Sequence, residues 1–201
     1  MIKIITAMYF EAKPLIDYYK LQKSNSNKPF SIYKNDYIEL IISGIGELNS
    51  AIATSYFLTK YKKTSFIINL GLCGSSNINH DIGKTFYINK IKSINHRKIF
   101  YPDIIVKHNF SESSLCTYNH KINKIKQISD TDYELLDMEA YGFYNAAYKF
   151  IAQDKISVIK ILSDHLNCNQ VEIDLIYSII KSSLPKLSDF FDNIIVYTEN
   201  D

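Results

Sequence analysis

The sequence predicts an α/β fold with a mixed β-sheet, organised as one domain of residues 1–201. Three features predict it: short apolar segments typical of buried strands, glycine-containing turns after several of them, and helical segments after those turns. The 201 residues, 46 % apolar and 22 % charged, have the composition of a globular chain with a substantial core. In such a fold we expect ligands to bind outside the carboxyl ends of the strands.

Charge, hydropathy and cysteine content argue against several classes of protein. The formal net charge of +2 gives no electrostatic basis for binding nucleic acid. No apolar run approaches the roughly 20 residues that a membrane-spanning helix needs. Cys73, Cys116 and Cys168 are far apart and lack paired metal-ligand spacing, which is typical of a reducing cytoplasm. We therefore expect a cytoplasmic protein that binds neither membrane nor nucleic acid and has no metal site.

The N-terminal part of the chain alternates between strand and helix patterns. Residues 2–7 form a short apolar segment, which predicts a first strand and not a signal peptide. Residues 8–19 predict a helix, in which Pro14 is compatible only with the first turn. The next expected elements are strands at 30–34 and 37–43 around a turn at Asn35-Asp36, a glycine break at 44–46, and a helix capped by Asn49 or Ser50 that runs to about Lys60.

The rest of the chain is organised around one buried strand. Residues 65–70 are mostly apolar, as in a buried parallel strand, and residues 71–76 follow as a tight glycine turn. Residues 93–130 are polar and lysine-rich, with a pattern too weak to define an element. The remaining expected elements are a strand at 83–91, a helix at 137–150, a strand at 156–162, a helix at 171–191 interrupted near Pro185, and a last short strand at 194–197.

Glu139 is the residue most informative about function. On the predicted helix it shares an apolar stripe with Leu136, Phe143, Ala147 and Phe150. A glutamate that faces the interior is unfavourable unless something binds it, which indicates a site. The alternative is a carboxylate near the start of a helix that favours the helix dipole or pairs with a lysine.

Two other carboxylates follow predicted strands. Asp164 comes after the strand at 156–162, where it could project into a cleft or, alternatively, cap the next helix. Glu11 lies beyond the first strand, and the alternative for it is a solvated glutamate in the first turn of a helix. Both residues lie at expected strand ends, as does the glycine turn, and α/β proteins bind ligands at such ends.

Six short motifs, taken in order, resemble those of the methylthioadenosine/S-adenosylhomocysteine nucleosidases and their phosphorylase relatives. The resemblance covers residues 1–92 and 131 to about 190. It implies a three-layer α/β/α domain with a central mixed, partly barrel-like sheet, a homodimer, and a reaction that requires no metal or other cofactor. The motifs are IITAM at 4–8 with Glu11, SGIG at 43–46, INLGLCG at 68–74, DIGK at 81–84, DMEA at 137–140 and SD at 163–164.

The resemblance also implies how these residues would cleave the N-glycosidic bond of a purine nucleoside. Asp164 would protonate or hydrogen-bond the departing base, and Glu11 would position and deprotonate the attacking water. Glu139 would hold the ribose hydroxyls, with Met138 packed on the sugar. The substrate-binding residues implied in this way are Met138, Glu139, Gly71, Leu72, Ser163 and Ile45.

The residues around Gly71 favour water over phosphate as the nucleophile. Phosphorylase relatives carry an arginine two positions before this glycine and a small hydroxyl residue after it. Asn69 and Leu72 occupy those positions here, and the only arginine of the sequence, Arg97, is remote from the first strand. A desolvated phosphate without an arginine partner would be poorly held. We therefore expect a nucleosidase that acts on a methylthioadenosine- or S-adenosylhomocysteine-like nucleoside.

Three alternatives remain open from the sequence: a purine or uridine nucleoside phosphorylase, a degenerate member that binds a nucleoside without turnover, and an interaction module with no ligand. Leu72 suggests the degenerate member, because the nucleosidases usually have serine there. Lys121 suggests it too, because it stands where they have the aromatic ring that stacks on adenine. Tyr118 is a candidate replacement for that ring.

Overall fold

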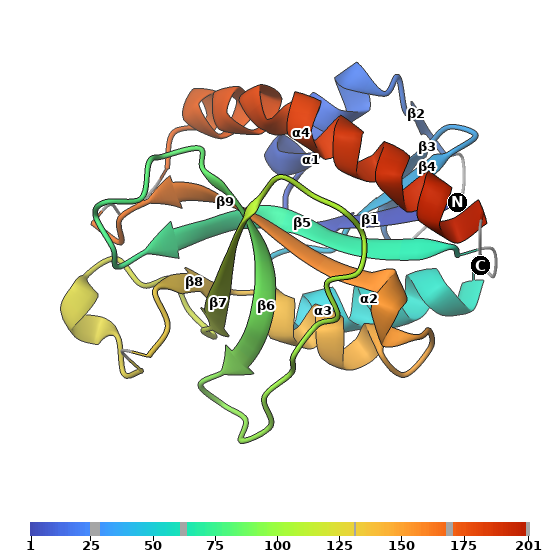
Figure 1. The fold of residues 1–201 in the computed structure, drawn as a ribbon. Coiled ribbons are helices and arrows are strands. Elements are labelled where there is room, and N and C mark those ends of the chain that lie inside the picture. The colour runs from blue at the N-terminus through green and yellow to red at the C-terminus, as the bar shows by residue number, and fades with distance from the viewer. Residues whose placement is uncertain (25–28, 61–63, 131, 168–170, 200–201) are drawn as a thin grey trace.

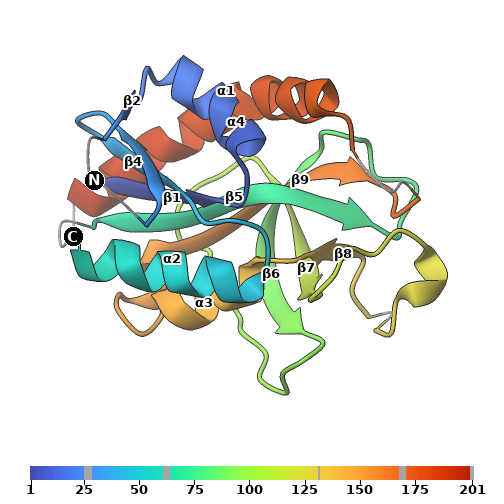
Figure 2. The same ribbon diagram turned by 180° about the vertical axis from the view of Figure 1, so that it is seen from behind.

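Helices cover both faces of a central sheet in the computed structural model, which describes residues 1–24, 29–60, 64–130, 132–167 and 171–199. Helices α1 (Tyr9–Tyr18) and α4 (Ile173–Glu199) lie on one face, and α2 (Glu47–Lys60) and α3 (Ala140–Ala147) lie on the other (Figure 1, Figure 2). This arrangement confirms the predicted three-layer fold. The strands are β1 (Ile2–Thr6), β2 (Gln22–Lys23), β3 (Ser31–Lys34), β4 (Ile38–Ile42), β5 (Phe66–Ser75), β6 (Thr85–Ser93), β7 (Ser111–Thr117), β8 (Leu135–Asp137) and β9 (Ile156–Asp164), with 3₁₀ turns η1 (Ile125–Gln127) and η2 (Gln153–Lys155).

Five strands of the sheet close on themselves. Within the described residues the sheet has nine strands in the order β2-β3-β4-β1-β5-β8-β7-β6-β9, and β9 also pairs with β5. The ring therefore runs through β5, β8, β7, β6 and β9, while β1 to β4 extend from β5 as an open sheet. Strand β9 is parallel to β5 but antiparallel to β6. The sheet is thus mixed and partly barrel-like, as predicted.

Strand β5 is buried on both faces and divides the core in two. Its side chains alternate, so Phe66, Ile68 and Leu70 belong to the cluster that includes α1 and α4. Ile67 and Cys73 belong to the cluster that includes α2 and α3. A strand covered on both sides requires a nearly continuous apolar run, and the run at 65–70 predicted it for this reason.

The predicted glycine turn at 71–76 is wrong, because β5 continues through these residues to Ser75. Pairing holds the extension: Gly71 lies opposite Lys160 of β9, and Gly74 lies opposite Leu136 of β8. The glycines serve close packing here, not a turn. A Cβ added to Gly74 would lie 2.2 Å from Cδ2 of Leu166.

The predicted helix at 137–150 is wrong at its start, because Asp137 ends β8 and the helix begins at Ala140. The backbone of Asp137 pairs with Thr117 of β7. Its carboxylate accepts hydrogen bonds from the backbone N–H groups of Glu139 and Ala140, at 3.1 and 2.7 Å. A strand partner remote in sequence, together with this carboxylate cap, decides where α3 begins.

Helix α4 has 27 residues, so the predicted interruption near Pro185 and the last strand at 194–197 are both wrong. A proline inside a helix costs about 3 kcal/mol, because it lacks an N–H donor and clashes with the preceding turn. Helix α4 offsets this cost through one uninterrupted buried stripe. The apolar members of that stripe are Ile176, Ile179, Ile180, Leu184, Leu187, Phe190, Phe191 and Ile194.

The other expected elements are confirmed with shifted boundaries. Two details are wrong: helix α2 begins at Glu47, so Asn49 and Ser50 lie inside it and do not cap it, and Pro14 lies beyond the first turn of α1. The weakly patterned region contains β7 and η1, and β2 had no predicted counterpart. Cys168 lies outside the described residues. No helix in the described ranges is both long and apolar enough to cross a membrane.

Candidate active site

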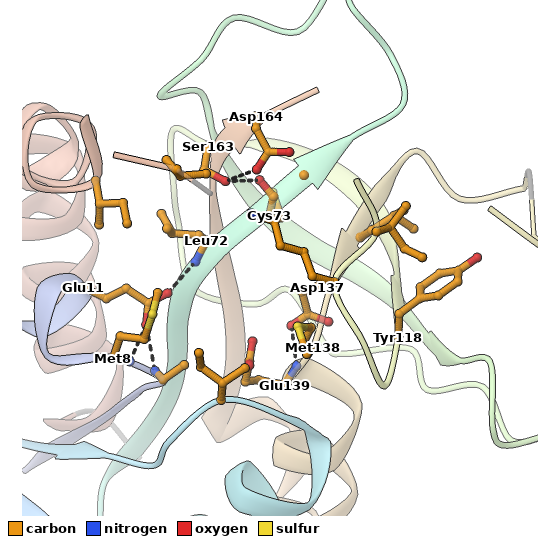
Figure 3. A pocket seen from close by; sticks show the side chains of 18 of the residues that line it. Met8, Glu11, Leu72, Cys73, Tyr118, Asp137, Met138, Glu139, Ser163 and Asp164 are labelled. Carbon is orange, nitrogen blue, oxygen red and sulfur yellow. Dashed lines mark hydrogen bonds between the residues drawn. The ribbon is translucent and has the colours of Figure 1, made fainter. Parts of the chain in front are cut away.

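A cavity of about 390 Å³ lies where β1, β5, β8 and β9 end (Figure 3). Strands β1 and β9 both run parallel to β5, so their carboxyl ends meet at this edge of the sheet. An open cavity beside Glu139 argues against an interaction module without a ligand. The predicted site residues that line the cavity are Glu11, Ile45, Leu72, Met138, Glu139, Ser163 and Asp164.

Glu11 lies in the first turn of α1, but its side chain points back into the cavity instead of into solvent. Its Oε2 accepts hydrogen bonds from the backbone N–H groups of Ala7 and Met8, at 2.8 and 2.9 Å. Its Oε1 accepts one from Leu72 at 3.2 Å. Burial raises the pKa of Glu11, while these bonds and the charge of Lys160 oppose the rise. The carboxylate is therefore fixed in direction and has an increased affinity for a proton.

Gly71 is not among the residues that line the cavity but lies against the Glu11 carboxylate. A Cβ at this position would lie 3.3 Å from Oε1 of Glu11 and 3.5 Å from Nζ of Lys160. Its role in the structure is thus to leave room for these two side chains. Gly71 lies in a regular strand, and its φ is not positive, so packing and not backbone conformation explains the glycine.

Asp137 and Lys160 form a buried ion pair beside the cavity. The distance from Lys160 Nζ to Asp137 Oδ2 is 2.8 Å, and the lysine side chain is 1 % exposed. The other oxygen of Asp137 accepts a hydrogen bond of 2.6 Å from the hydroxyl of Thr117. Three strands, β7, β8 and β9, therefore hold one carboxylate in place. Attraction to the neighbouring carboxylates raises the pKa of Lys160 although its burial lowers it.

Glu139 occupies the N-cap position of α3 and is buried, with its carboxylate at the cavity. Its Oε1 accepts a hydrogen bond of 2.8 Å from the N–H of Gly46, in the loop before α2. Burial, with the nearby charge of Asp137, raises the pKa of Glu139 to about 7. The predicted burial is confirmed, but the predicted stripe is wrong: Leu136 belongs to β8, and Phe150 is exposed.

Asp164 ends β9 and faces the cavity from the side remote from Glu139 (Figure 3). Its Oδ1 accepts a hydrogen bond of 2.8 Å from the N–H of Leu166, and the Ser163 hydroxyl lies 2.8 Å from Oδ2. The same hydroxyl lies 3.1 Å from the carbonyl oxygen of Cys73. Helix α4 begins later, at Ile173, so the alternative interpretation of Asp164 as a helix cap is wrong.

Apolar side chains form the remaining walls. Tyr118 is buried against the cavity, and its hydroxyl accepts a hydrogen bond of 3.1 Å from the N–H of Ser129. Lys121, which replaces the expected aromatic residue, also lines the cavity. Further apolar residues of the cavity wall are Ala7, Met8, Phe10, Ile122, Leu136, Leu166, Val171, Ile173 and Ile176.

Two charged groups of the cavity region, Lys160 and Asp137, had no predicted role. Lys160 is a charged residue inside the mostly apolar strand at 156–162, and Asp137 is the first residue of the DMEA motif. A charge inside a buried strand is unfavourable without a partner, so the sequence could indicate that Lys160 is paired. The sequence could not identify Asp137 as the partner, because the pairing depends on the ring of strands.

A comparison with known protein sequences finds similarity to a nucleosidase. No protein-family model matches the chain. The aminodeoxyfutalosine nucleosidase of Campylobacter jejuni is 32 % identical over 94 residues, which are 45 % of this chain and 41 % of that protein. The match thus spans less than half the length of this relative.

Solved structures of nucleosidases match over nearly the whole chain. A mutant 5′-methylthioadenosine/S-adenosylhomocysteine nucleosidase of Helicobacter pylori, with 5′-methylthioadenosine in its active site, matches with a TM-score of 0.77 at 14 % identity and covers 95 % of this chain and 97 % of its own. The Neisseria meningitidis enzyme, in complex with methylthio-immucillin-A, matches with a TM-score of 0.75 at 15 % identity and covers 96 % of this chain and 97 % of its own. Futalosine hydrolase of Helicobacter pylori matches with a TM-score of 0.73 at 14 % identity and covers 98 % of this chain and 97 % of its own. The chain has the fold of these proteins.

Proposed function

We propose that this chain, whose similarity to the nucleoside phosphorylase and nucleosidase superfamily is confirmed, hydrolyses the N-glycosidic bond of a purine nucleoside. The products would be the free base and the sugar. The observation that carries the proposal is the set of acidic side chains at one cavity: Glu11, Glu139 and Asp164 come from separate elements and line it together. The fold alone would not support it, because function depends on the site.

Each carboxylate suits one part of the reaction. Cleavage builds positive charge on the ribosyl ring and negative charge on the departing base. Glu11, held by three backbone N–H groups, would orient the attacking water and accept its proton. Asp164, on the remote side of the cavity, would protonate or hydrogen-bond the base. Glu139 would bind the ribose hydroxyls beside Met138, and the carboxylates together favour the developing positive charge.

The charge at the sugar end supports water over phosphate as the nucleophile. Three carboxyl groups, Glu11, Asp137 and Glu139, surround the Lys160 ammonium group there, so a phosphate dianion would be repelled. Asn69 is buried and donates to the carbonyl of Ile5, 3.3 Å away, and is not among the residues that line the cavity. This combination disfavours the phosphorylase alternative.

We propose a methylthioadenosine-like nucleoside as the substrate class. The purine would pack on the Tyr118 ring, and Ile45 and Leu72 would border the sugar. The apolar walls supplied by α1 and α4 suit an uncharged 5′ substituent. The names of the relatives support a 5′-modified nucleoside, since they include methylthioadenosine, futalosine and aminodeoxyfutalosine nucleosidases.

A direct assay tests the proposal. Purified protein is incubated with methylthioadenosine, S-adenosylhomocysteine, adenosine or inosine, with and without phosphate, and free base is measured. We expect release without phosphate, and a loss of about 10²–10⁴-fold in kcat for both Glu11→Gln and Asp164→Asn. The control is Glu134→Gln, which changes an exposed carboxylate that is not among the cavity-lining residues.

Two other outcomes of the assay would overturn the proposal. Release of base only in the presence of phosphate would identify a phosphorylase. Thermal stabilisation by a nucleoside with no release of base would identify the degenerate, binding-only member.

We propose that the protein forms a homodimer through the start of α2. Ile45, Leu48 and Ile52 are 50 %, 73 % and 51 % exposed, and Leu48 and Ile52 lie one turn apart on the helix. Ile45 also lines the cavity, so a second copy placed here would border the site. Light scattering should give a dimer mass for the wild type and a monomer mass for Leu48→Asp; a monomeric wild type would contradict the proposal.

We also propose that residues 1–201 form one cytoplasmic domain. Strand β5 supports a single domain, because it pairs with β1 from the N-terminal part and with β9 from the C-terminal part. Cys73 and Cys116 support a reducing compartment, because both are buried free thiols. Limited proteolysis that leaves one protected fragment, and fractionation of cells that make the protein, would test these two statements.

A further inference from the structure

Lys160 is a buried cation to which the mechanism above assigns no step. It lies on β9, four residues before Asp164, and its ammonium group is 2.8 Å from Asp137. An isolated lysine at such a depth would be strongly destabilising, so its surroundings must favour the charge. They do, because attraction to carboxylates outweighs desolvation and raises the pKa of Lys160.

The groups that face Lys160 come from several elements packed around it. Asp137 is its direct partner from β8, while Glu11 from α1 and Glu139 at the start of α3 act on it through their charges. Lys160 Nζ and Glu11 Oε1 lie 3.5 and 3.3 Å from the position that a Cβ of Gly71 would occupy, so both groups lie against this glycine. The titratable groups around it are Glu11, Cys73, Asp137 and Glu139, with Asp164 beyond Cys73.

We propose that Lys160 is a positioning residue of this site, which anchors Asp137 and whose positive charge keeps Glu11 in its carboxylate form. Without this cation, the burial that raises the pKa of Glu11 would be opposed only by its backbone hydrogen bonds, and Glu11 would bind a proton more readily. A protonated Glu11 cannot accept a proton from water. The inference rests on the proposed hydrolysis and adds the group that makes its general base available.

The pH profile of kcat/KM tests the role of Lys160. We expect Lys160→Met to move the acidic limb upward by about one to two pH units, because an opposite charge at this range lowers a carboxyl pKa by a comparable amount. Lys160→Arg keeps the charge and should keep the limb. A uniform loss of activity without a shift of the limb would overturn the proposal.

Lys3 provides the matched control. It is also a fully buried lysine of the sheet with a carboxylate partner, Glu39, at 2.9 Å, but it pairs β1 with β4 away from the cavity. Lys3→Met should lower the stability and leave the acidic limb unchanged. If both lysine variants change the profile alike, Lys160 has only a structural role and the proposal is wrong.

A measurement without substrate separates this proposal from the proposed function. Carboxyl-carbon NMR of glutamate-labelled protein follows the titration of Glu11, assigned by comparison with Glu11→Gln. The midpoint should rise by about one to two pH units in Lys160→Met. If that variant does not fold, Lys160→Met combined with Asp137→Asn removes both charges of the pair, and the midpoint should still rise. An unchanged midpoint overturns the proposal even in an active enzyme, whereas an inactive wild type with the expected shift contradicts only the hydrolysis.

Discussion

The burial of Glu139 makes the stability of the protein depend on pH in a direction opposite to that of an ordinary ion-paired glutamate. The pKa of Glu139 is about 7 in the folded chain, against 4.5 for the unperturbed group. The folded state therefore binds a proton more tightly than the unfolded state. Protonated Glu139 stabilises the fold at low pH, and this contribution is lost as the pH rises from 4.5 through 7.

The size of the effect follows from the two pKa values. Moving a pKa from 4.5 to about 7 corresponds to about 3 kcal/mol, of which about 2 to 3 kcal/mol falls between pH 5 and pH 8. Glu139→Gln removes the titration but keeps an oxygen that can accept from the N–H of Gly46. The stability of this variant relative to wild type should therefore increase by about 2 to 3 kcal/mol between pH 5 and pH 8.

Urea unfolding of wild type and Glu139→Gln, each at pH 5 and pH 8, measures this change in relative stability. The chain has no tryptophan, so circular dichroism should follow the transition. Met138→Leu is the control, because it alters the adjacent cavity residue without changing a titratable group, and its effect should be the same at both pH values. A Glu139→Gln effect that is equally independent of pH would refute the reasoning, because it would mean that folding does not raise the pKa of Glu139.

Three further predictions concern glycine and proline positions. Gly142→Ala should lower stability by about 3 kcal/mol or more in urea unfolding, because its Cβ would lie 2.0 Å from the backbone oxygen of Glu47; a near-neutral change would contradict the close crossing of α2 and α3. Pro185→Ala should raise stability by about 1–3 kcal/mol by restoring a helical N–H donor, and a loss would mean that the proline ring itself is needed in the core. Gly71→Ala should lower kcat at least about tenfold, because the new methyl group displaces Glu11, with circular dichroism as the check that the fold is retained.

The local sequence pattern was sufficient to predict those parts of the fold in which burial and backbone preference favour the same structure. The apolar run at 65–70 predicted a central strand because both faces of β5 are covered by helices. Glu11 and Asp164 were predicted at strand ends and Glu139 on the buried stripe of a helix, and the structure brings all three to one cavity. Such positions can be predicted because loops that follow parallel strands meet at the same edge of a sheet.

Contacts between segments that are distant in sequence decided the rest. Helix α4 continues past Pro185 because its stripe packs on the sheet, and β5 continues past Gly71 because β9 pairs with it. Lys160 meets Asp137 only when the ring of strands closes. Sequence periodicity can indicate that a charge is buried, but the register between remote strands selects its partner. The sequence by itself thus determined the superfamily resemblance and the acidic residues of the site, and only the tertiary structure determined the cation that balances them.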